Sequence, residues 1–421
     1  MKTTVEKILI KGKKRIKGRI PISGSKNAAL PIIAASLLTD KKVSIRNIPN
    51  IADVHVMIEL VNSMGANVHF QKNTLSVEAA EIAAGALAHN PLANKVRYSI
   101  HLIGALLSRF NKIQSPLPGG CKIGTRKLDS YILALTSLGA NVRIKDNNIE
   151  VQSDELHGSH IVLEYPSVSA TENAIIAASL ATGTSIIENS AKEPEIVDLA
   201  NFLNSMGAKI RGAGAERIEV VGVDMLSGAD YTIIPDRIET GTFMVAAAIT
   251  GGKVLLQNTT TRFMGSVVSK LSEAGMEIYE SNGTVHAASQ DLVYPVDIVT
   301  SVYPGFSTDM QPIVTPLLTL AKGQSTIKET IYENRFNHVM ELRKMGADIT
   351  IKGDTLIVSG PTRLVGAEVE ARDIRSGASI LLAGLAAEGK TLVHNASQIF
   401  RGYEDPITKL KNVGACLELV T

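Results

Sequence analysis

The 421-residue sequence contains little cysteine, no marked excess of either charge and no long apolar run. Its two cysteines, Cys121 and Cys416, cannot build a disulfide framework, which favours a reducing compartment. The 43 Lys and Arg residues face 41 Asp and Glu residues, so the basic excess that is typical of duplex-binding proteins is missing. The longest apolar stretch, near 28–38, contains Pro31 and is too short to span a bilayer. We therefore expect a cytoplasmic protein that binds neither nucleic acid nor a membrane.

The one strongly basic segment lies between residues 11 and 19 and lacks the apolar core of a signal peptide. Apolar residues accompany it like two short strands around Lys11-Gly12. A nucleic-acid-binding arm is the alternative, but this pattern favours a solvated hairpin.

Internal repetition is the strongest organisational signal. Six times a helix ends in glycine and a short alternating strand follows, and each glycine suits a left-handed helix stop. These glycines are Gly65, Gly139, Gly207, Gly275, Gly346 and Gly414. A second helix precedes each of these helices and is apolar on nearly every face, which predicts burial. The predicted buried helices cover 26–38, 98–109, 170–182, 240–250, 309–321 and 376–387.

From these helix faces we infer that the helices lie at the centre of the protein and the strands pack outside them. Six units divide most simply into two domains of three, with a break near 230–236. From the repeats alone, the N-terminal segment could pack with either half.

Two motif matches are interpreted as coincidental, and one histidine spacing is too sparse to predict a metal site. Residues 384–391 fit the P-loop pattern, but an apolar helix runs into Gly389 and a strand follows, the reverse of the order that a P-loop needs. The Ser-x-x-Lys match at 23–26 lacks the other serine-acylase motifs. His157 and His160 have no supporting Cys, Asp or Glu cluster, so we expect no metal site.

The segment 116–127 is different in kind, because two prolines and three glycines exclude regular structure there. Cys121 lies in it beside Lys122 and Arg126. Most intracellular cysteines are small buried hydrophobes, and Cys416 fits that description. Positive charge around Cys121 instead favours the thiolate, which predicts a reactive acid or nucleophile.

Charged and polar residues gather at the starts of the predicted buried helices or in the segments between them. A single ion pair among them could be purely structural, but several cations together with a carboxylate favour a binding site for an anionic ligand. Helix N-termini would add their positive ends. The residues are Lys26, Asn27, Arg97, Asp309, Arg335, Asp373, Arg375 and Arg401.

Taken with the repeats, these residues resemble the enolpyruvyl transferase family, and within it the UDP-N-acetylglucosamine 1-carboxyvinyltransferases of peptidoglycan synthesis. The similarity covers essentially the whole chain and rests on six motifs. They are Gly-Ser-Lys-Asn at 24–27, Leu-Pro-Gly-Gly-Cys at 117–121, Glu-Asn-x-x-x-Glu-Pro-Glu-Ile-Val-Asp at 188–198, Tyr-Pro-Gly-Phe-x-Thr-Asp-Met-Gln at 303–311, Glu-Asn-Arg-Phe at 333–336 and Asp-Ile-Arg at 373–375.

The resemblance implies a two-domain inverted α/β barrel of six βαβαββ units, three per domain, with helices buried and sheets outside. It implies a first domain of residues 23–234, carrying the catalytic loop 116–127. The second domain is then discontinuous, with residues 1–22 joining 235–421. Substrates are expected in a cleft that the loop closes as a lid.

The implied reaction adds the 3-hydroxyl of UDP-N-acetylglucosamine to C2 of phosphoenolpyruvate and then expels phosphate. By family matching, Lys26, Arg126 and Arg401 bind the phosphate and carboxylate of phosphoenolpyruvate. Asp309 accepts the proton of the hydroxyl. Cys121 protonates C3, can form a covalent adduct with phosphoenolpyruvate, and is the residue that fosfomycin alkylates. The resemblance implies no cofactor or metal, because cations supply the electrostatic stabilisation.

Further matched positions are expected to bind substrate, mostly the uridine nucleotide sugar. They are Asn27, Arg97, Arg126, Lys127, Leu128, Asp129, Ser167, Val168, Asp309, Ile331, Arg335, Asp373 and Arg375. Three positions depart from the common pattern, namely Lys127 where proline is frequent, Ser169 where glycine is common, and Tyr165 where a basic residue can occur. These departures concern nucleotide contacts more than the chemistry.

Three alternatives stay open at this point. The shikimate-pathway enolpyruvyl transferase shares the architecture and the donor, but is expected to have Ser-Lys-Ser in place of Ser25-Lys26-Asn27 and to lack the cysteine loop. RNA 3′-phosphate cyclase shares the repeat topology, but is expected to carry a nucleotidylated histidine and a more basic face. A non-catalytic paralogue would keep the repeats and lose the charged site residues.

Overall fold

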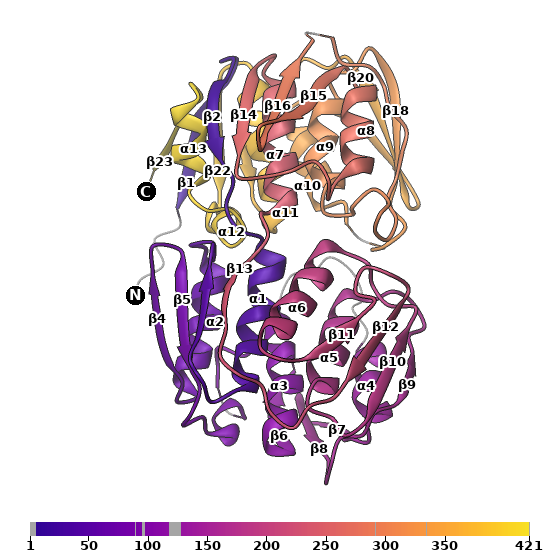
Figure 1. Ribbon diagram of the computed structural model, residues 1–421. Coiled ribbons are helices and arrows are strands. Elements are labelled where there is room, and N and C mark those ends of the chain that lie inside the picture. Colours follow the sequence, from indigo (N-terminus) through magenta and orange to yellow (C-terminus); the bar gives the residue numbers. More distant parts are fainter. Residues whose placement is uncertain are drawn as a thin grey trace. The chain divides into compact units, whose positions relative to one another are not determined.

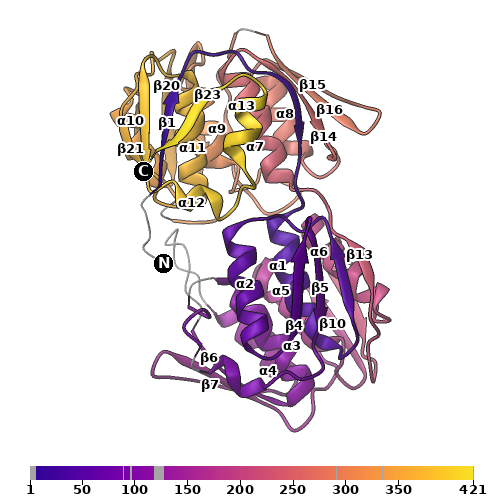
Figure 2. The same cartoon turned by 90° about the vertical axis from the view of Figure 1, so that its left-hand side faces the viewer.

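The computed structural model describes residues 6–88, 90–94, 97–117, 128–290, 292–333 and 335–420. The chain divides into two compact units (Figures 1 and 2). We call residues 24–234 the first unit, and the residues up to 23 together with those from 235 onward the second unit. Each unit is described by itself.

The first unit contains three repeats, each with an inner helix, an outer helix and a small sheet. Repeat one comprises β13 (Asp230–Thr232), α1 (Lys26–Ala35), η1 (Ser36–Leu38), β3 (Val43–Arg46), α2 (Ala52–Ser63), β4 (Asn67–Gln71) and β5 (Thr74–Glu78). Repeat two comprises η2 (Ala84–Leu87), η3 (Arg97–Ser99), α3 (Ile100–Phe110), β6 (Lys112–Pro116), α4 (Asp129–Ser137), β7 (Asn141–Lys145) and β8 (Asn148–Gln152). Repeat three comprises β9 (His160–Val162), α5 (Val168–Ala178), β10 (Thr184–Glu188), α6 (Pro194–Ser205), β11 (Lys209–Arg211) and β12 (Arg217–Val221).

The second unit repeats the same plan. Repeat four comprises β2 (Lys17–Pro21), α7 (Arg237–Ile249), β14 (Lys253–Gln257), α8 (Gly265–Glu273), β15 (Met276–Ser281) and β16 (Thr284–Ser289). Repeat five comprises β17 (Ile298–Val299), α9 (Gln311–Leu318), β18 (Gly323–Lys328), α10 (Asn337–Lys344), β19 (Asp348–Lys352) and β20 (Thr355–Gly360). Repeat six comprises β21 (Glu368–Glu370), α11 (Ile374–Ala386), β22 (Lys390–His394), α12 (Ser397–Phe400), α13 (Pro406–Asn412), β23 (Cys416–Val420) and β1 (Lys7–Lys11).

The inner helices are buried as predicted. Every residue of α11 is buried, and Asn27 is the one residue of α1 that is not. The outer helices keep a polar face; in α2 the buried positions include Val54, Met57 and Leu60, at helical spacing. Figure 1 shows the sheets lying outside the inner helices of each unit. The predicted inverted architecture of six repeated units is confirmed, although the sheet of repeat two has three strands among the described residues and the others have four.

The glycines that end the outer helices adopt the predicted left-handed conformation. Gly65, Gly139, Gly207, Gly275, Gly346 and Gly414 have φ values of 103°, 95°, 102°, 99°, 91° and 98°. The P-loop match is a helix stop as well, because α11 ends at Ala386, Gly389 has φ 85° and β22 begins at Lys390. No helix N-terminus follows that glycine segment, so it cannot present backbone amides to phosphate in the P-loop manner.

The predicted N-terminal hairpin is wrong, because its two strands form but do not pair with each other. β1 lies antiparallel between β22 and β23, with Ile8 opposite both Val393 and Leu419. β2 pairs parallel with β14. Repeat six has a single strand, β23, after its outer helices, so β1 fills the position that a hairpin partner fills in the other repeats. Alternating Ile8 and Ile10 then bury against the core of the second unit.

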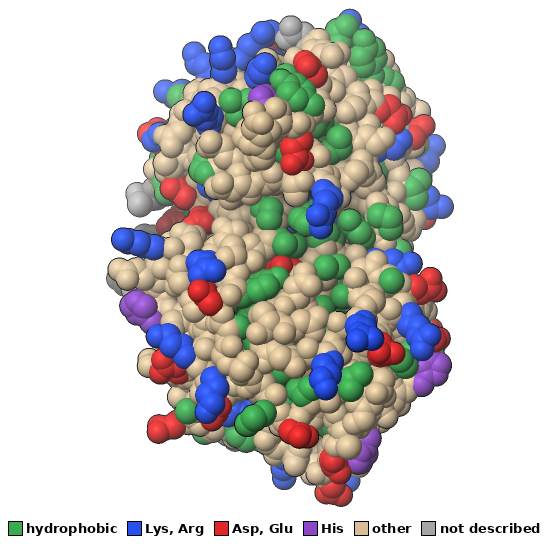
Figure 3. Space-filling model, viewed as in Figure 1, with side chains coloured by type: hydrophobic (Ala, Val, Ile, Leu, Met, Phe, Trp, Pro, Cys, Tyr) green, Lys and Arg blue, Asp and Glu red, His purple; other side chains and the backbone are tan. Residues whose placement is uncertain are grey.

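The basic side chains of this segment are exposed, which agrees with the predicted solvation. They are Lys11, Lys13, Lys14, Arg15, Lys17 and Arg19. Lys and Arg side chains also gather at the end of the second unit shown at the upper left of Figure 3. No helix in the described part of the chain is both long enough and apolar enough to cross a membrane.

Candidate active site

The second unit brings one carboxylate and two arginines together, just before or in the first turns of α9, α10 and α11. Asp309 precedes α9, and Arg375 lies in the first turn of α11. Arg335 Nη2 donates to Asp309 Oδ1 at 2.5 Å, and Arg375 donates to Asp309 Oδ2 through Nη2 at 2.9 Å and Nε at 3.1 Å. Both arginine side chains are 6% exposed, whereas the Asp309 side chain is 25% exposed. Of the three side chains in this cluster, Asp309 is therefore the one that solvent or a ligand can reach.

These contacts fix the protonation state of Asp309. Burial by itself raises the pKa of a carboxyl group, but the guanidinium groups of Arg335 and Arg375 outweigh it and hold the pKa of Asp309 well below its usual range. The pKa of Arg375 shifts in the opposite direction. Burial lowers it, but Tyr403, Asp309 and Asp236 outweigh burial and raise it above its usual value. In this arrangement Asp309 is a stable anion and a poor proton acceptor.

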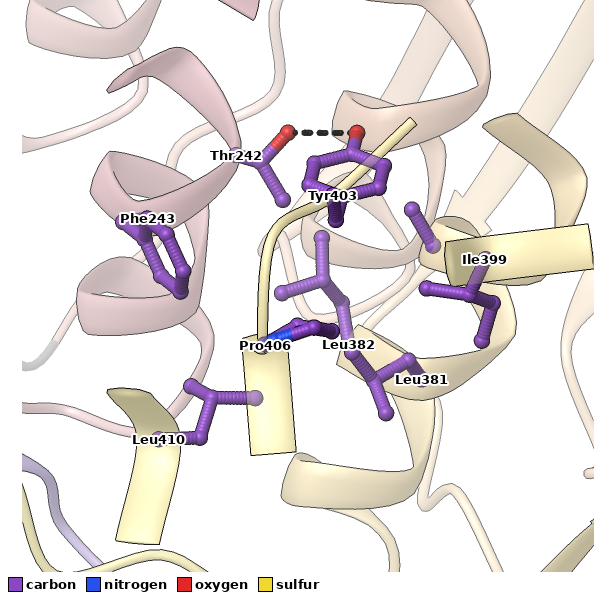
Figure 4. A pocket seen from close by; sticks show the side chains of 9 residues that line it. Thr242, Phe243, Leu381, Leu382, Ile399, Tyr403, Pro406 and Leu410 are labelled. Carbon is purple, nitrogen blue, oxygen red and sulfur yellow. Dashed lines mark hydrogen bonds between the residues drawn. The ribbon is translucent and has the colours of Figure 1, made fainter. Parts of the chain in front are cut away.

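The aromatic ring of Tyr403 packs against the guanidinium group of Arg375. The guanidinium carbon of Arg375 lies 5.4 Å from the centroid of the Tyr403 ring, a cation–π distance. The Tyr403 hydroxyl is hydrogen-bonded to Thr242 Oγ1 in α7 at 2.9 Å. Beside Tyr403 lies a small apolar cavity (Figure 4), lined by Thr242, Phe243, Ala378, Leu381, Leu382, Ile399, Tyr403, Pro406 and Leu410. The two polar groups of its lining bond to each other, so the cavity offers no partner to a polar ligand.

The other predicted residues of the second unit have structural contacts of their own. Asp373 caps α11 by accepting from the backbone of Arg375 and Ser376, and a serine hydroxyl completes the capping box. The Ile331 N–H donates to Glu329 Oε1 at 2.9 Å. Arg401 ends the short helix α12, and its Nη1 donates to Gln398 Oε1 at 3.0 Å.

In the first unit, Lys26 opens α1 behind the capping residue Ser25. Lys26 Nζ lies 2.6 Å from Asp53 Oδ2 in the first turn of α2, and both side chains are 6% exposed. Asn27 Oδ1 accepts from the Tyr98 hydroxyl at 2.8 Å. Tyr98 precedes α3, so the N-terminal ends of α1 and α3 meet at this contact.

Four further predicted residues of the first unit also lie at helix starts. Ser167 caps α5 by accepting from the backbone of Ala170, and Val168 is the first residue of that helix. Leu128 occupies the cap position of α4, and Asp129 begins it. A carboxylate in the first turn complements the helix dipole.

A buried polar pair lies deeper in the first unit. His101 Nε2 is 2.6 Å from Glu172 Oε2, and both side chains are 1% exposed. Burial raises the pKa of Glu172, partly offset by His101. The imidazole also stacks on Tyr98, with ring centroids 5.4 Å apart. This pair thus lies directly behind the Tyr98–Asn27 contact.

Several predicted residues cannot be placed. Cys121, Arg126 and Lys127 lie outside the described residues, as does the side chain of Arg97. Among the residues that the structure does describe, no three His, Cys, Asp or Glu side chains are grouped in a way that could hold a metal ion.

Sequence reasoning missed Asp53, Glu329 and Tyr403, which contact or support predicted residues. Asp53 belongs to no recognisable motif, and its contact with Lys26 arises only because α2 packs beside α1. Glu329 lies two residues before Ile331, and Tyr403 lies two residues after Arg401. Proximity to the predicted residues was the one signal that could have indicated these two.

Comparisons with known proteins agree with this architecture. The model of the family described as EPSP synthase (3-phosphoshikimate 1-carboxyvinyltransferase) matches residues 10–410. The structure of the enolpyruvyl transferase NikO from Streptomyces tendae has a TM-score of 0.90 at 24% identity, covering 99% of each chain. EPSP synthase from Acinetobacter baumannii has a TM-score of 0.76 at 18% identity, covering 99% of this chain and 100% of its own. These two likenesses concern the fold.

Two curated relatives are much more similar in sequence. The UDP-N-acetylglucosamine 1-carboxyvinyltransferase of Halothermothrix orenii is 46% identical over 414 residues, which cover 98% of this chain and 99% of the relative. The enzyme of the same name from Magnetococcus marinus is 45% identical over 416 residues, with the same coverage.

The fold and the family model define a class, the two-domain enolpyruvyl transferases with inverted α/β barrels. Within this class, the chain belongs to the family of the UDP-N-acetylglucosamine 1-carboxyvinyltransferases. The resemblance that the sequence motifs carry is confirmed.

Proposed function

We propose that the protein transfers the enolpyruvyl group of phosphoenolpyruvate to the 3-hydroxyl of UDP-N-acetylglucosamine and releases phosphate. A proton adds to C3 of phosphoenolpyruvate while the hydroxyl oxygen adds to C2, which gives a tetrahedral intermediate. Loss of a proton from C3 and cleavage of the C2–O bond to phosphate then restore the double bond. The observation that carries the proposal is the identity of 45% and 46% with relatives of that name along nearly the whole chain.

Lys26, Arg126 and Arg401 are proposed to bind the phosphate and carboxylate of phosphoenolpyruvate. The ion pair of Lys26 with Asp53 supports this role for Lys26, because it gives the buried Lys26 side chain a counter-ion and an orientation before a substrate anion arrives. A phosphate would compete with Asp53 for the same ammonium group. Donor binding is thus an exchange of anions at Lys26.

Asp309 is proposed to accept the proton of the attacking hydroxyl. Its bonds to Arg335 and Arg375 must loosen for this role, because they lower the pKa of Asp309 far below the range of a useful base. An anionic substrate can supply that change by drawing a guanidinium group to itself. Arg335, Arg375 and the helix-capping Asp373 complete the proposed substrate-binding set of the second unit.

The nucleotide sugar is proposed to contact Ile331, in the segment after β18, and residues that lie in or next to α1, α3, α4 and α5 in the sequence. They are Asn27, Arg97, Ser167, Val168, Ile331 and the stretch from Arg126 through Lys127 and Leu128 to Asp129. The bond from the Tyr98 hydroxyl occupies the amide oxygen of Asn27, so the amide nitrogen is the group left to donate to a ligand.

Cys121 is proposed to protonate C3, to form a covalent adduct with phosphoenolpyruvate and to be alkylated by fosfomycin. We expect Cys121→Ser to abolish most turnover, while Cys121→Asp keeps an acid at this position and resists fosfomycin. Mass spectrometry of the intact protein after incubation with fosfomycin measures the adduct directly. Alkylation or full fosfomycin sensitivity of the Asp variant would refute the assignment.

This activity would place the protein in the cytoplasm, at the first committed step of peptidoglycan synthesis, and so in cell-wall biogenesis, cell shape and division. The competing acceptor is 3-phosphoshikimate, which the name of the matched family model favours. Asn27, where that enzyme is expected to have serine, argues against it. Incubation with phosphoenolpyruvate and UDP-N-acetylglucosamine, followed by detection of the enolpyruvyl product by mass, tests the proposal.

A further inference from the structure

Glu329 is a buried carboxylate that collects four hydrogen bonds just after β18. The residue is 3% exposed. Its Oε1 accepts from the hydroxyl of Thr300 at 2.9 Å and from the backbone N–H groups of Ile331 at 2.9 Å and Tyr332 at 3.2 Å. Its Oε2 accepts from the Thr308 hydroxyl at 2.9 Å. Rotation of this carboxylate would leave several buried donors unsatisfied, so its orientation is fixed.

One arm of this network runs to Asp309. The Thr308 hydroxyl has a single proton and donates it to Glu329, so its lone pairs are free to accept from Arg335 Nη1 at 3.0 Å. Arg335 Nη2 in turn donates to Asp309 Oδ1. The contacts thus run from the carboxylate of Glu329 through the Thr308 hydroxyl and the Arg335 guanidinium group to the carboxylate of Asp309. Glu329 thereby sets which way Arg335 points and where it holds Asp309.

The other arm folds the backbone after β18 around the same carboxylate. Thr300 Oγ1 donates to Glu329 and accepts from the Thr330 N–H at 2.9 Å. The Thr330 hydroxyl donates to the Thr300 carbonyl at 2.6 Å. Together with the N–H of Ile331, these bonds fix the segment that carries Ile331, a proposed contact of the nucleotide sugar.

We propose that Glu329 is a positioning residue that holds the proton acceptor Asp309 and the nucleotide-sugar contact Ile331 in one arrangement. The inference rests on the proposed function, because the roles of Asp309 and Ile331 come from it. Glu329 itself touches no substrate, since its two oxygens are both engaged within the protein. Its effect reaches the chemistry through Thr308 and reaches acceptor binding through Thr300.

Separate variants can cut each arm. Thr308→Val removes the link toward Asp309, so we expect kcat to fall roughly tenfold with the KM for UDP-N-acetylglucosamine nearly unchanged. Thr300→Val loosens the Ile331 segment, so that KM rises roughly tenfold and kcat changes less. Glu329→Gln weakens both arms and should show both effects.

Glu280→Gln is the matched control. Glu280 also accepts from two threonine hydroxyls, those of Thr260 and Thr261, and from the Thr261 N–H, but it is exposed, lies in β15 and is not one of the proposed site residues. We expect this variant to retain the kcat and KM of the wild type. Calorimetric titration with UDP-N-acetylglucosamine checks the binding effect without turnover.

The outcomes separate the inference from the function on which it rests. A purely structural role of Glu329 would lower kcat and raise KM in the same proportion in both threonine variants, and that result would overturn the inference. Wild-type kinetics in all three variants would overturn it as well. If Glu329→Gln does not fold, the two threonine variants carry the test. A wild-type enzyme that forms no enolpyruvyl product contradicts the proposed function first, and the inference with it.

Discussion

The two units share one repeat plan, and the carboxylate Asp309 of the second unit differs from two buried carboxylates of the first unit. In the second unit, Asp309 lies between two guanidinium groups, which lower its pKa in spite of burial. In the first unit, burial outweighs the hydrogen bonds that Asp198 accepts from Tyr231 and Ile234 and raises the pKa of Asp198 to about 6. The pKa of Glu172 is raised too, although His101 is its partner. The balance between burial and charged partners decides whether a carboxyl group in this fold is a fixed charge. In the second unit itself, burial raises the pKa of Glu239 although Lys409 Nζ lies 2.7 Å from its carboxylate.

Removal of the fixed charge should have the largest effect. Asp309→Asn leaves two buried guanidinium groups without their anion, and we expect a loss of stability of about 3 kcal/mol. It also removes the proposed base, so turnover should fall by about 100-fold or more. Thermal unfolding and kcat measure the two effects, and Asp348→Asn, at an exposed position in β19, is the control. Turnover within a few-fold of the wild type would show that Asp309 holds the arginines and does no chemistry.

The Lys26–Asp53 pair allows the same comparison in the first unit. Lys26→Ala should cost roughly 3 kcal/mol, because Asp53 loses the cation 2.6 Å away, and should raise the KM for phosphoenolpyruvate. Adding Asp53→Ala should restore much of the stability without restoring use of the donor. If the double variant regains the wild-type KM, Lys26 serves the fold and does not bind the donor.

Acid should weaken the second unit through His338. Burial lowers the pKa of His338 to about 3, with Asp373 opposing and Arg335 adding to the shift. The unfolded chain binds a proton near pH 6.5 and the folded chain does not, so this group costs stability as the pH falls from about 6.5 toward 3. His338→Gln should flatten that slope, measured by hydrogen exchange in α10. An unchanged slope would mean that His338 takes up a proton in the folded state.

Asp198 should respond in the opposite direction, in the first unit. Its folded pKa of about 6 lies above the usual 3.8, so the folded protein takes up a proton between these values while the unfolded chain does not. Stability at this site should therefore rise as the pH falls from about 6 toward 4. Asp198→Asn should lack the rise when hydrogen exchange in α6 is compared at pH 7 and pH 4.5. A rise of the same size in the variant would assign it to another group.

The smallest expected effect concerns a helix stop. A Cβ at Gly207 would meet nothing within 4 Å, so Gly207→Ala should cost only the strain of its φ of 102°, about 1 kcal/mol. A Cβ at Gly65 would lie 2.6 Å from the Glu81 carbonyl oxygen, so Gly65→Ala should cost more. Chemical denaturation of both variants tests the order, and equal losses would contradict it.

Much of the fold could be predicted because its signals are local. An all-apolar helix such as α11 must be surrounded by protein, and the glycine after each outer helix needs a positive φ whatever lies nearby. The partner of β1 could not be read from β1 itself. Its alternating isoleucines suit any strand neighbour, and the one it has depends on a sixth repeat that lacks a strand.

The candidate site divides in the same way. Lys26, Asp309 and Arg375 stand out as charges beside apolar helices, and the structure places all three at inner-helix starts. Asp53 and Glu329 were missed because their importance lies in contacts between elements. Whether Glu329 faces Thr308 depends on the packing of two segments that are 21 residues apart in sequence.

Release of phosphate from phosphoenolpyruvate, measured with each of two acceptors, tests the central claim most directly. The account predicts phosphate release with UDP-N-acetylglucosamine, none with 3-phosphoshikimate, and loss of the signal after treatment with fosfomycin. Release with 3-phosphoshikimate alone, or with neither acceptor, would contradict it.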